Sequence, residues 1–169
     1  MEYDLAKEIN GQAVATEIAR HELYGCTGAE MVQEMKPYHI DFPNVKNNCL
    51  RFEVSPSIEE SATFTDADWA ELGNDFMQRM GLANHQYIII RHSGTESKKE
   101  QAHLHILANR VSLSGELYRD NWIGKKATEA ANAIAKERNF VQSQDIGKVN
   151  KAEIKEAMDG VLKKMQGFD

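Results

Sequence analysis

Two runs decide the fold of this chain: QYIIIR at 86–91 and HLHILANRV at 103–111. The first is rich in β-branched residues and apolar at successive positions, as in a central strand. The second predicts another strand of similar length. The polar stretch between them is too short for the helical crossover that parallel strands need, so we expect an antiparallel pair.

The segments around these runs predict further strands and helices. Residues 50–54 alternate between apolar and polar side chains, which is the period of a half-buried strand. A capping-box pattern opens a predicted helix over 65–81. Apolar residues at helical spacing predict helices over 4–21, 125–138 and 149–166. This arrangement favours the α+β class, an antiparallel sheet flanked by helices, over a doubly wound α/β fold.

The composition predicts one cytoplasmic domain that spans residues 1–169. A chain of this length with 41% hydrophobic residues can bury a core without disulfides or a structural metal. No apolar run approaches the roughly 20 residues that a membrane span needs, and no secretory leader opens the chain. Its two cysteines, Cys26 and Cys49, fit a reducing cytoplasm.

The charge is distributed unevenly along the chain. The net charge is −6, but residues 1–85 hold 6 basic against 15 acidic residues, whereas 86–169 hold 14 against 11. Lysine and arginine provide most phosphate contacts, so an acidic chain is a poor non-specific binder of nucleic acid. Any contact with DNA is therefore expected to use the second half.

Three histidines are predicted to converge at one end of the strand pair. His103 and His105 are two residues apart in a strand, so both point to the same face. His92 ends the preceding strand, and antiparallel pairing would bring it beside them. Three imidazoles with an open position are typical of a catalytic divalent-metal site. The alternative is a pair of ordinary histidines on the solvent face of a sheet.

Other catalytic patterns are absent from the sequence. It has no G-x-x-x-x-G-K-[ST] loop and no G-x-G-x-x-G loop that would hold nucleotide phosphates. It has no G-x-S-x-G motif for a serine nucleophile. The histidines therefore carry the functional prediction.

These residues also resemble a known family. The run 86–92, the polar loop, the strand 103–111 and Gly115 are similar to the relaxase/mobilisation nuclease family of plasmids and mobilisable transposons. The stretch 50–56 and the helix after it look like the second motif of that family. The resemblance extends over about residues 3–140 and implies a sheet of about five antiparallel strands, with helices beside it.

The resemblance implies a reaction as well. Relaxases nick one strand of DNA at a transfer origin, and a tyrosine attacks the scissile phosphate to give a 5′-phosphotyrosine and a free 3′-hydroxyl. The residues that match the metal ligands of the family are His92, His103 and His105, which would hold Mg²⁺ or Mn²⁺. The implied partners are single-stranded DNA and other relaxosome proteins, with no membrane.

Tyr3 is the residue that matches the nucleophile of the family. It lies in a Y-x-x-x-K context with Lys7, whereas Tyr24 is the second candidate and Tyr87 is expected in the core. Relatives carry more residues before this tyrosine, and those residues form their first strand. We therefore expect the domain to lack that strand, or to receive it from a second chain.

Further residues are candidates for supporting roles. Glu53 is a candidate acid that orients a histidine, or alternatively a solvated glutamate paired with Arg51 or a lysine, and Glu96 could serve instead. Basic residues in the second half are candidates for DNA-phosphate contacts: Lys98, Lys99, Arg110, Arg119, Lys125 and Lys126.

Three functions remain open at this point. The first is a metal-dependent relaxase that nicks and rejoins DNA through a covalent tyrosine intermediate. The second is a relaxase-derived DNA-binding module that does not cut. The third is a metal-dependent phosphodiesterase that acts on small phosphoesters with the same histidines.

Overall fold

The computed structural model describes residues 8–9, 12–93, 101–142, 151–152, 154–159 and 161. The chain forms two compact units, Met1–Ala131 and Asn132–Asp169. The second unit includes the end of one helix, and its backbone is helical at 151–152, 154–159 and 161. No helix among the described residues is long and apolar enough to cross a membrane.

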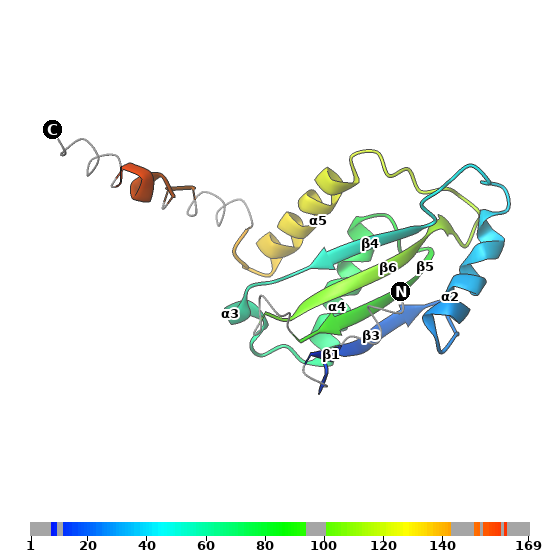
Figure 1. The fold of residues 1–169 in the computed structure, drawn as a ribbon, viewed down its shortest axis with the longest axis horizontal. Coiled ribbons are helices and arrows are strands. Elements are labelled where there is room, and N and C mark those ends of the chain that lie inside the picture. The colour runs from blue at the N-terminus through cyan, green and yellow to red at the C-terminus, as the bar shows by residue number, and fades with distance from the viewer. Residues whose placement is uncertain are drawn as a thin grey trace. The chain divides into compact units, whose positions relative to one another are not determined.

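The first unit is built on a four-stranded antiparallel sheet (Figure 1). The strands lie in the order β3 (Ala15–His21), β5 (His85–His92), β6 (His103–Ser112) and β4 (Cys49–Val54). The predicted strand pair is thus the centre of the sheet, and the α+β class is confirmed. A short hairpin of β1 (Glu8–Ile9) and β2 (Gln12–Ala13) precedes β3.

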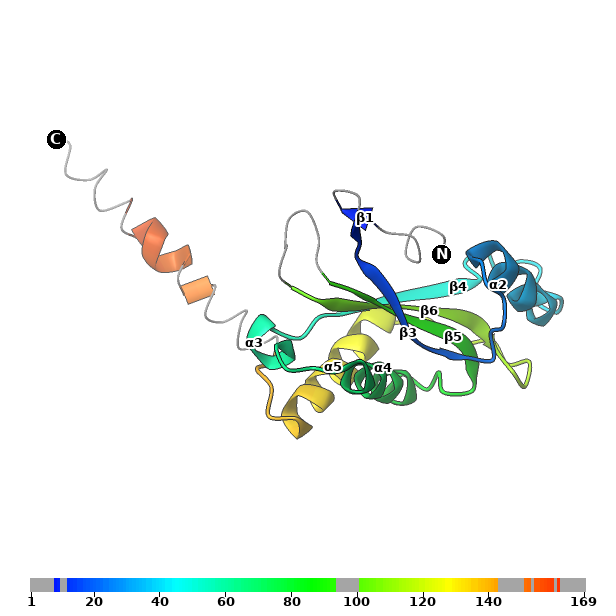
Figure 2. The same cartoon turned by 90° about the horizontal axis from the view of Figure 1, so that it is seen from below.

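One face of the sheet is covered by α4 (Asp66–Arg79) (Figure 2). This helix begins with the predicted capping box, in which the Asp68 amide donates to Thr65 Oγ1 at 3.3 Å. Its Gly73 allows a close approach, since a Cβ there would lie 2.7 Å from Ile89 Cδ1. The first part of α5 (Ile123–Glu137), up to Ala131, lies on the same side of the sheet.

The opposite face is covered at one end by α2 (Gly28–Met35), which the 3-10 helix η1 (Lys36–His39) follows. Met31 and Met35 of this helix join a buried cluster with Leu23, Ile88, Ile90 and Leu107. Burial of such side chains supplies about 25 cal/mol per Å² of apolar surface. The histidines lie on this same face, at the other end of the sheet.

The helix predicted over 4–21 is wrong for the residues that the structure describes. Residues 15–21 form β3, which pairs with β5 so that Ala15 lies opposite His92. The ladder shifts register between Glu17 and Ala19, and a bulge of this kind moves later side chains to the other face. The apolar and polar residues of β3 therefore do not alternate along the whole strand. The spacing of its apolar residues in the sequence resembles that of a helix. The remaining helix, α3 (Ile58–Ser61), is a single short turn.

Candidate metal centre

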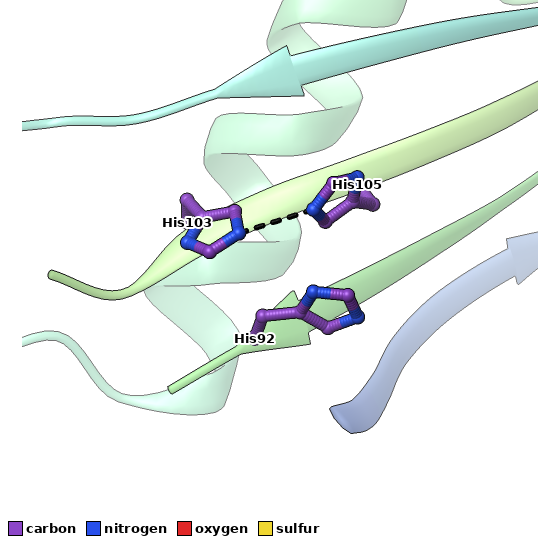
Figure 3. Close-up of side chains that lie close together, drawn as sticks. All are labelled: His92, His103 and His105. Carbon is purple, nitrogen blue, oxygen red and sulfur yellow. Dashed lines mark hydrogen bonds between the residues drawn. The ribbon is translucent and has the colours of Figure 1, made fainter. Parts of the chain in front are cut away.

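The three predicted histidines converge at the end of the two central strands (Figure 3). His92 ends β5 and lies opposite His103, the first residue of β6, in the ladder. His105 follows on the same face of β6. The residues are 0%, 4% and 5% exposed, and each offers a ring nitrogen within 4.8 Å of the others. Paired strands thus fix all three rings relative to one another.

The hydrogen bonds around His103 and His105 determine which ring nitrogen carries the hydrogen. Arg51 Nη2 lies 2.8 Å from His105 Nδ1, and a guanidinium can only donate, so this nitrogen accepts. His105 Nε2 then carries the hydrogen and donates it to His103 Nε2 at 3.0 Å. His103 Nδ1 donates in turn to the Gln101 carbonyl at 3.1 Å. The three contacts form one chain in which each ring donates once.

The geometry of these residues fits a divalent cation. Two nitrogens that bind one cation at about 2.1 Å and at a right angle lie about 3 Å apart, and the two Nε2 atoms are separated by 3.0 Å. The His92 ring centroid is 4.3 Å from that of His105, so the third ring is close enough to complete the set. Three imidazoles suit a divalent transition metal and leave coordination positions for oxygen ligands.

Comparison with known families matches residues 3–140 to relaxases, specifically to the MobA/VirD2-like nuclease domain. That match spans most of the 169 residues. The chain belongs to this relaxase family. Its general activity is therefore DNA processing of the nicking type, and its histidine cluster could hold the metal on which relaxases depend. Neither the curated proteins nor the solved structures contain a match to the chain.

The relaxase domain places Arg51 and Glu53 on the face that carries the histidines. Glu53 is the ladder partner of His105, so their side chains leave the sheet side by side. Arg51, two residues earlier, makes the hydrogen bond to His105. Sequence reasoning treated Arg51 only as a partner for Glu53. The alternation in 50–54 puts both residues on one face, but only the pairing of β4 with β6 reveals which histidine they meet.

The tyrosines that the structure describes are placed away from this cluster: Tyr24, Tyr38, Tyr87 and Tyr118. Tyr24 follows the end of β3 that is distant from His92, about 20 Å away at about 3.3 Å per residue. Tyr87 points to the α4 face and donates to Asn74 Oδ1. The Tyr118 amide bonds to the Arg110 carbonyl, toward the far end of β6.

The pKa shifts of three of them, Tyr24, Tyr87 and Tyr118, also argue against a nucleophilic role. Burial raises the pKa of both Tyr87 and Tyr118. A hydrogen bond to Glu22 raises the pKa of Tyr24. An activated nucleophile is expected to have the opposite shift. Tyr3 lies outside the described residues, as do Glu96, Lys98 and Lys99.

The remaining basic candidates lie near or beyond the far end of β6. Arg110 has structural contacts: its Nη2 bonds to Asp120 Oδ1 at 2.7 Å and its Nε donates to the Tyr118 carbonyl. Arg119, Lys125 and Lys126 are exposed. Lys126 Nζ lies over the Tyr118 ring, 5.1 Å from its centroid. This end of the sheet is distant from the histidines.

Proposed function

We propose that this relaxase domain nicks one DNA strand at a transfer origin, with Tyr3 as the nucleophile and a divalent cation held by His92, His103 and His105. The observation that carries the proposal is the buried histidine cluster at the end of two paired strands. The chain enters the sheet at the same end, since the Val14 carbonyl accepts from the Ser93 amide at 2.9 Å.

The length of chain before β3 supports Tyr3 in this role. The β1–β2 hairpin pairs Glu8 with Ala13, which directly precedes Val14. Tyr3 is five residues before Glu8, and five extended residues span at most about 17 Å. This length keeps Tyr3 within about 17 Å of Glu8, whereas the described tyrosines are fixed at other positions.

The proposed reaction is a transesterification at phosphorus. The Tyr3 oxygen forms a bond to the scissile phosphorus, the bond from phosphorus to the 3′-oxygen breaks, and the 3′-oxygen takes up a proton. The tyrosine proton passes to solvent, so no oxidant or cofactor is consumed. A bound divalent cation would offset the phosphate charge as a Lewis acid. The Gln101 carbonyl fixes the ring of His103 with Nε2 directed into the site.

We also propose where the DNA and other partners would lie. Single-stranded DNA would cross the histidine end of the sheet beside Glu53, and Lys98 and Lys99 would contact its phosphates. Arg119, Lys125 and Lys126 would contact phosphates further along the strand. In this proposal the domain acts in the cytoplasm in plasmid or transposon mobilisation, with other relaxosome proteins.

A covalent-adduct assay tests the proposal. The full chain is incubated with Mn²⁺ and single-stranded oligonucleotides that tile the replicon encoding it, and adducts that survive denaturation are counted. We expect an adduct that chelation or Tyr3→Phe abolishes and that the matched Tyr24→Phe variant retains. An adduct that persists in the Tyr3→Phe variant contradicts the assignment of Tyr3 as the nucleophile. Binding without any adduct would support the non-cutting module, and hydrolysis of a simple phosphodiester without DNA would support the phosphodiesterase.

A further inference from the structure

The hydrogen bond from Arg51 to His105 conflicts with binding of a cation by the same ring. Arg51 donates to Nδ1 at 2.8 Å, which places the ring hydrogen on Nε2. With this hydrogen bound, His105 Nε2 has no free electron pair on the side that faces His103 Nε2, 3.0 Å away. A cation between the two Nε2 atoms needs this same electron pair. The Arg51 contact and ligation through Nε2 therefore exclude one another.

Glu53 has the opposite preference for the same ring nitrogen. It lies opposite His105 in the β4–β6 ladder, where Cβ atoms are about 5 Å apart. A carboxylate can only accept, so it suits a ring with the hydrogen on Nδ1. Metal-bound histidines usually donate their second N–H to such an acceptor. Strand β4 therefore presents a donor and an acceptor to one nitrogen.

We infer that His105 changes partners from Arg51 to Glu53 when a cation binds. One proton leaves Nε2 for solvent and one arrives on Nδ1, so the ring stays neutral. Its new N–H donates to the Glu53 carboxylate. This inference rests on the metal site of the proposed function.

Calorimetry of Mn²⁺ binding to the full chain tests the partner exchange. We expect Arg51→Met to bind Mn²⁺ about fivefold more tightly, because one competing hydrogen bond is lost. We expect Glu53→Gln to bind about tenfold more weakly, the size of effect that partners of metal ligands show. The matched controls are Lys46→Met and Glu116→Gln, which remove the same charges at exposed positions away from the histidines.

Salt separates partner exchange from simple charge repulsion. Repulsion between Arg51 and the cation would be screened between about 0.1 M and 1 M salt, where the Debye length falls from about 10 Å to 3 Å. Exchange predicts that the gain in Arg51→Met persists at both concentrations. A gain that disappears at high salt, or no gain at all, would overturn the inference.

Nitrogen NMR of the His105 ring shows directly which ring nitrogen carries the hydrogen, without a measurement of metal affinity. We expect the hydrogen on Nε2 in the metal-free chain and on Nδ1 with diamagnetic Zn²⁺. A metal-free ring with the hydrogen on Nδ1 overturns the exchange whatever the metal does. If Mn²⁺ does not bind the wild-type chain, the proposed metal site fails as well. Binding that His103→Ala abolishes, but that Arg51→Met and Glu53→Gln leave unchanged, overturns the exchange alone.

Discussion

His39 and Asn109 are joined by a buried hydrogen bond of 2.6 Å, at the end of the sheet that is distant from the histidine cluster. Asn109 Oδ1 accepts from His39 Nε2 and from the Val111 amide, and its Nδ2 donates to Gln86 Oε1 at 2.9 Å. The Asn109 side chain is fully buried. The Asn109 side-chain amide thus forms hydrogen bonds with polar groups of η1, β5 and β6.

Replacement of Asn109 is therefore expected to destabilise the fold strongly. Asn109→Ala leaves several buried donors and acceptors without a partner, at about 1–3 kcal/mol for each such group. We expect a loss of about 3 kcal/mol in the free energy of unfolding, measured by urea denaturation. A double-mutant cycle with His39→Ala should show a coupling energy of about 1 kcal/mol, and additive losses would contradict the bond.

His85 is expected to make the free energy of unfolding depend on pH. Burial lowers the pKa of this imidazole, although its Nδ1 donates to the Asn109 carbonyl at 2.9 Å. In the unfolded chain, the His85 imidazole binds a proton near pH 6.5. In the folded chain it binds a proton only at lower pH, because its pKa is lowered. The contribution of His85 is thus fully present above about pH 6.5 and is lost as the pH falls through the folded pKa.

Urea denaturation between pH 7.5 and 5 measures this effect. The wild-type chain should lose more free energy of unfolding on acidification than His85→Gln, whose amide can still donate. An equal loss in the two chains would assign the acid sensitivity to other groups.

Gly73 is expected to be intolerant of any side chain. Gly73→Ala gains about 1 kcal/mol of helix propensity, but its Cβ would lie 2.7 Å from Ile89 Cδ1 and 3.3 Å from Leu104 Cδ1. Overpacking of this kind costs about 1–3 kcal/mol. We expect a net loss of about 1 kcal/mol by urea denaturation. In the matched background Ile89→Val, which lacks Cδ1 but keeps the Cγ2 methyl group at 3.1 Å, the same substitution should cost less than in the wild type.

Metal binding should stabilise the folded domain. A ligand that binds only the folded state at 100 times its dissociation constant adds about 2.7 kcal/mol. We expect Mn²⁺ to raise the melting temperature measured by circular dichroism, and EDTA to reverse the increase. The His103→Ala/His105→Ala variant should show no increase. The variant His21→Ala changes a histidine at the opposite end of β3 and should respond like the wild type.

The sequence was sufficient to predict those features that depend on residues close to one another in the chain. The central strand pair, the Thr65 capping box and the convergence of three histidines all follow from spacing within short segments. β3 was missed because a bulge at Glu17–Ala19 hides its alternation. The Arg51–His105 contact was missed because it joins residues 54 positions apart through the pairing of β4 with β6. No local pattern contains that pairing.

Because the three histidines lie in the two inner strands, their arrangement should be lost only when the whole sheet unfolds. β5 and β6 have a hydrogen-bonded neighbour on each side, and backbone amides in such strands exchange with deuterium mainly through global unfolding. His92, His103 and His105 should accordingly belong to the most protected unit of the domain. Local opening at an outer strand would then leave the ligand geometry in place. The metal site would persist as long as the sheet does, while the sequences of the outer segments can vary around it.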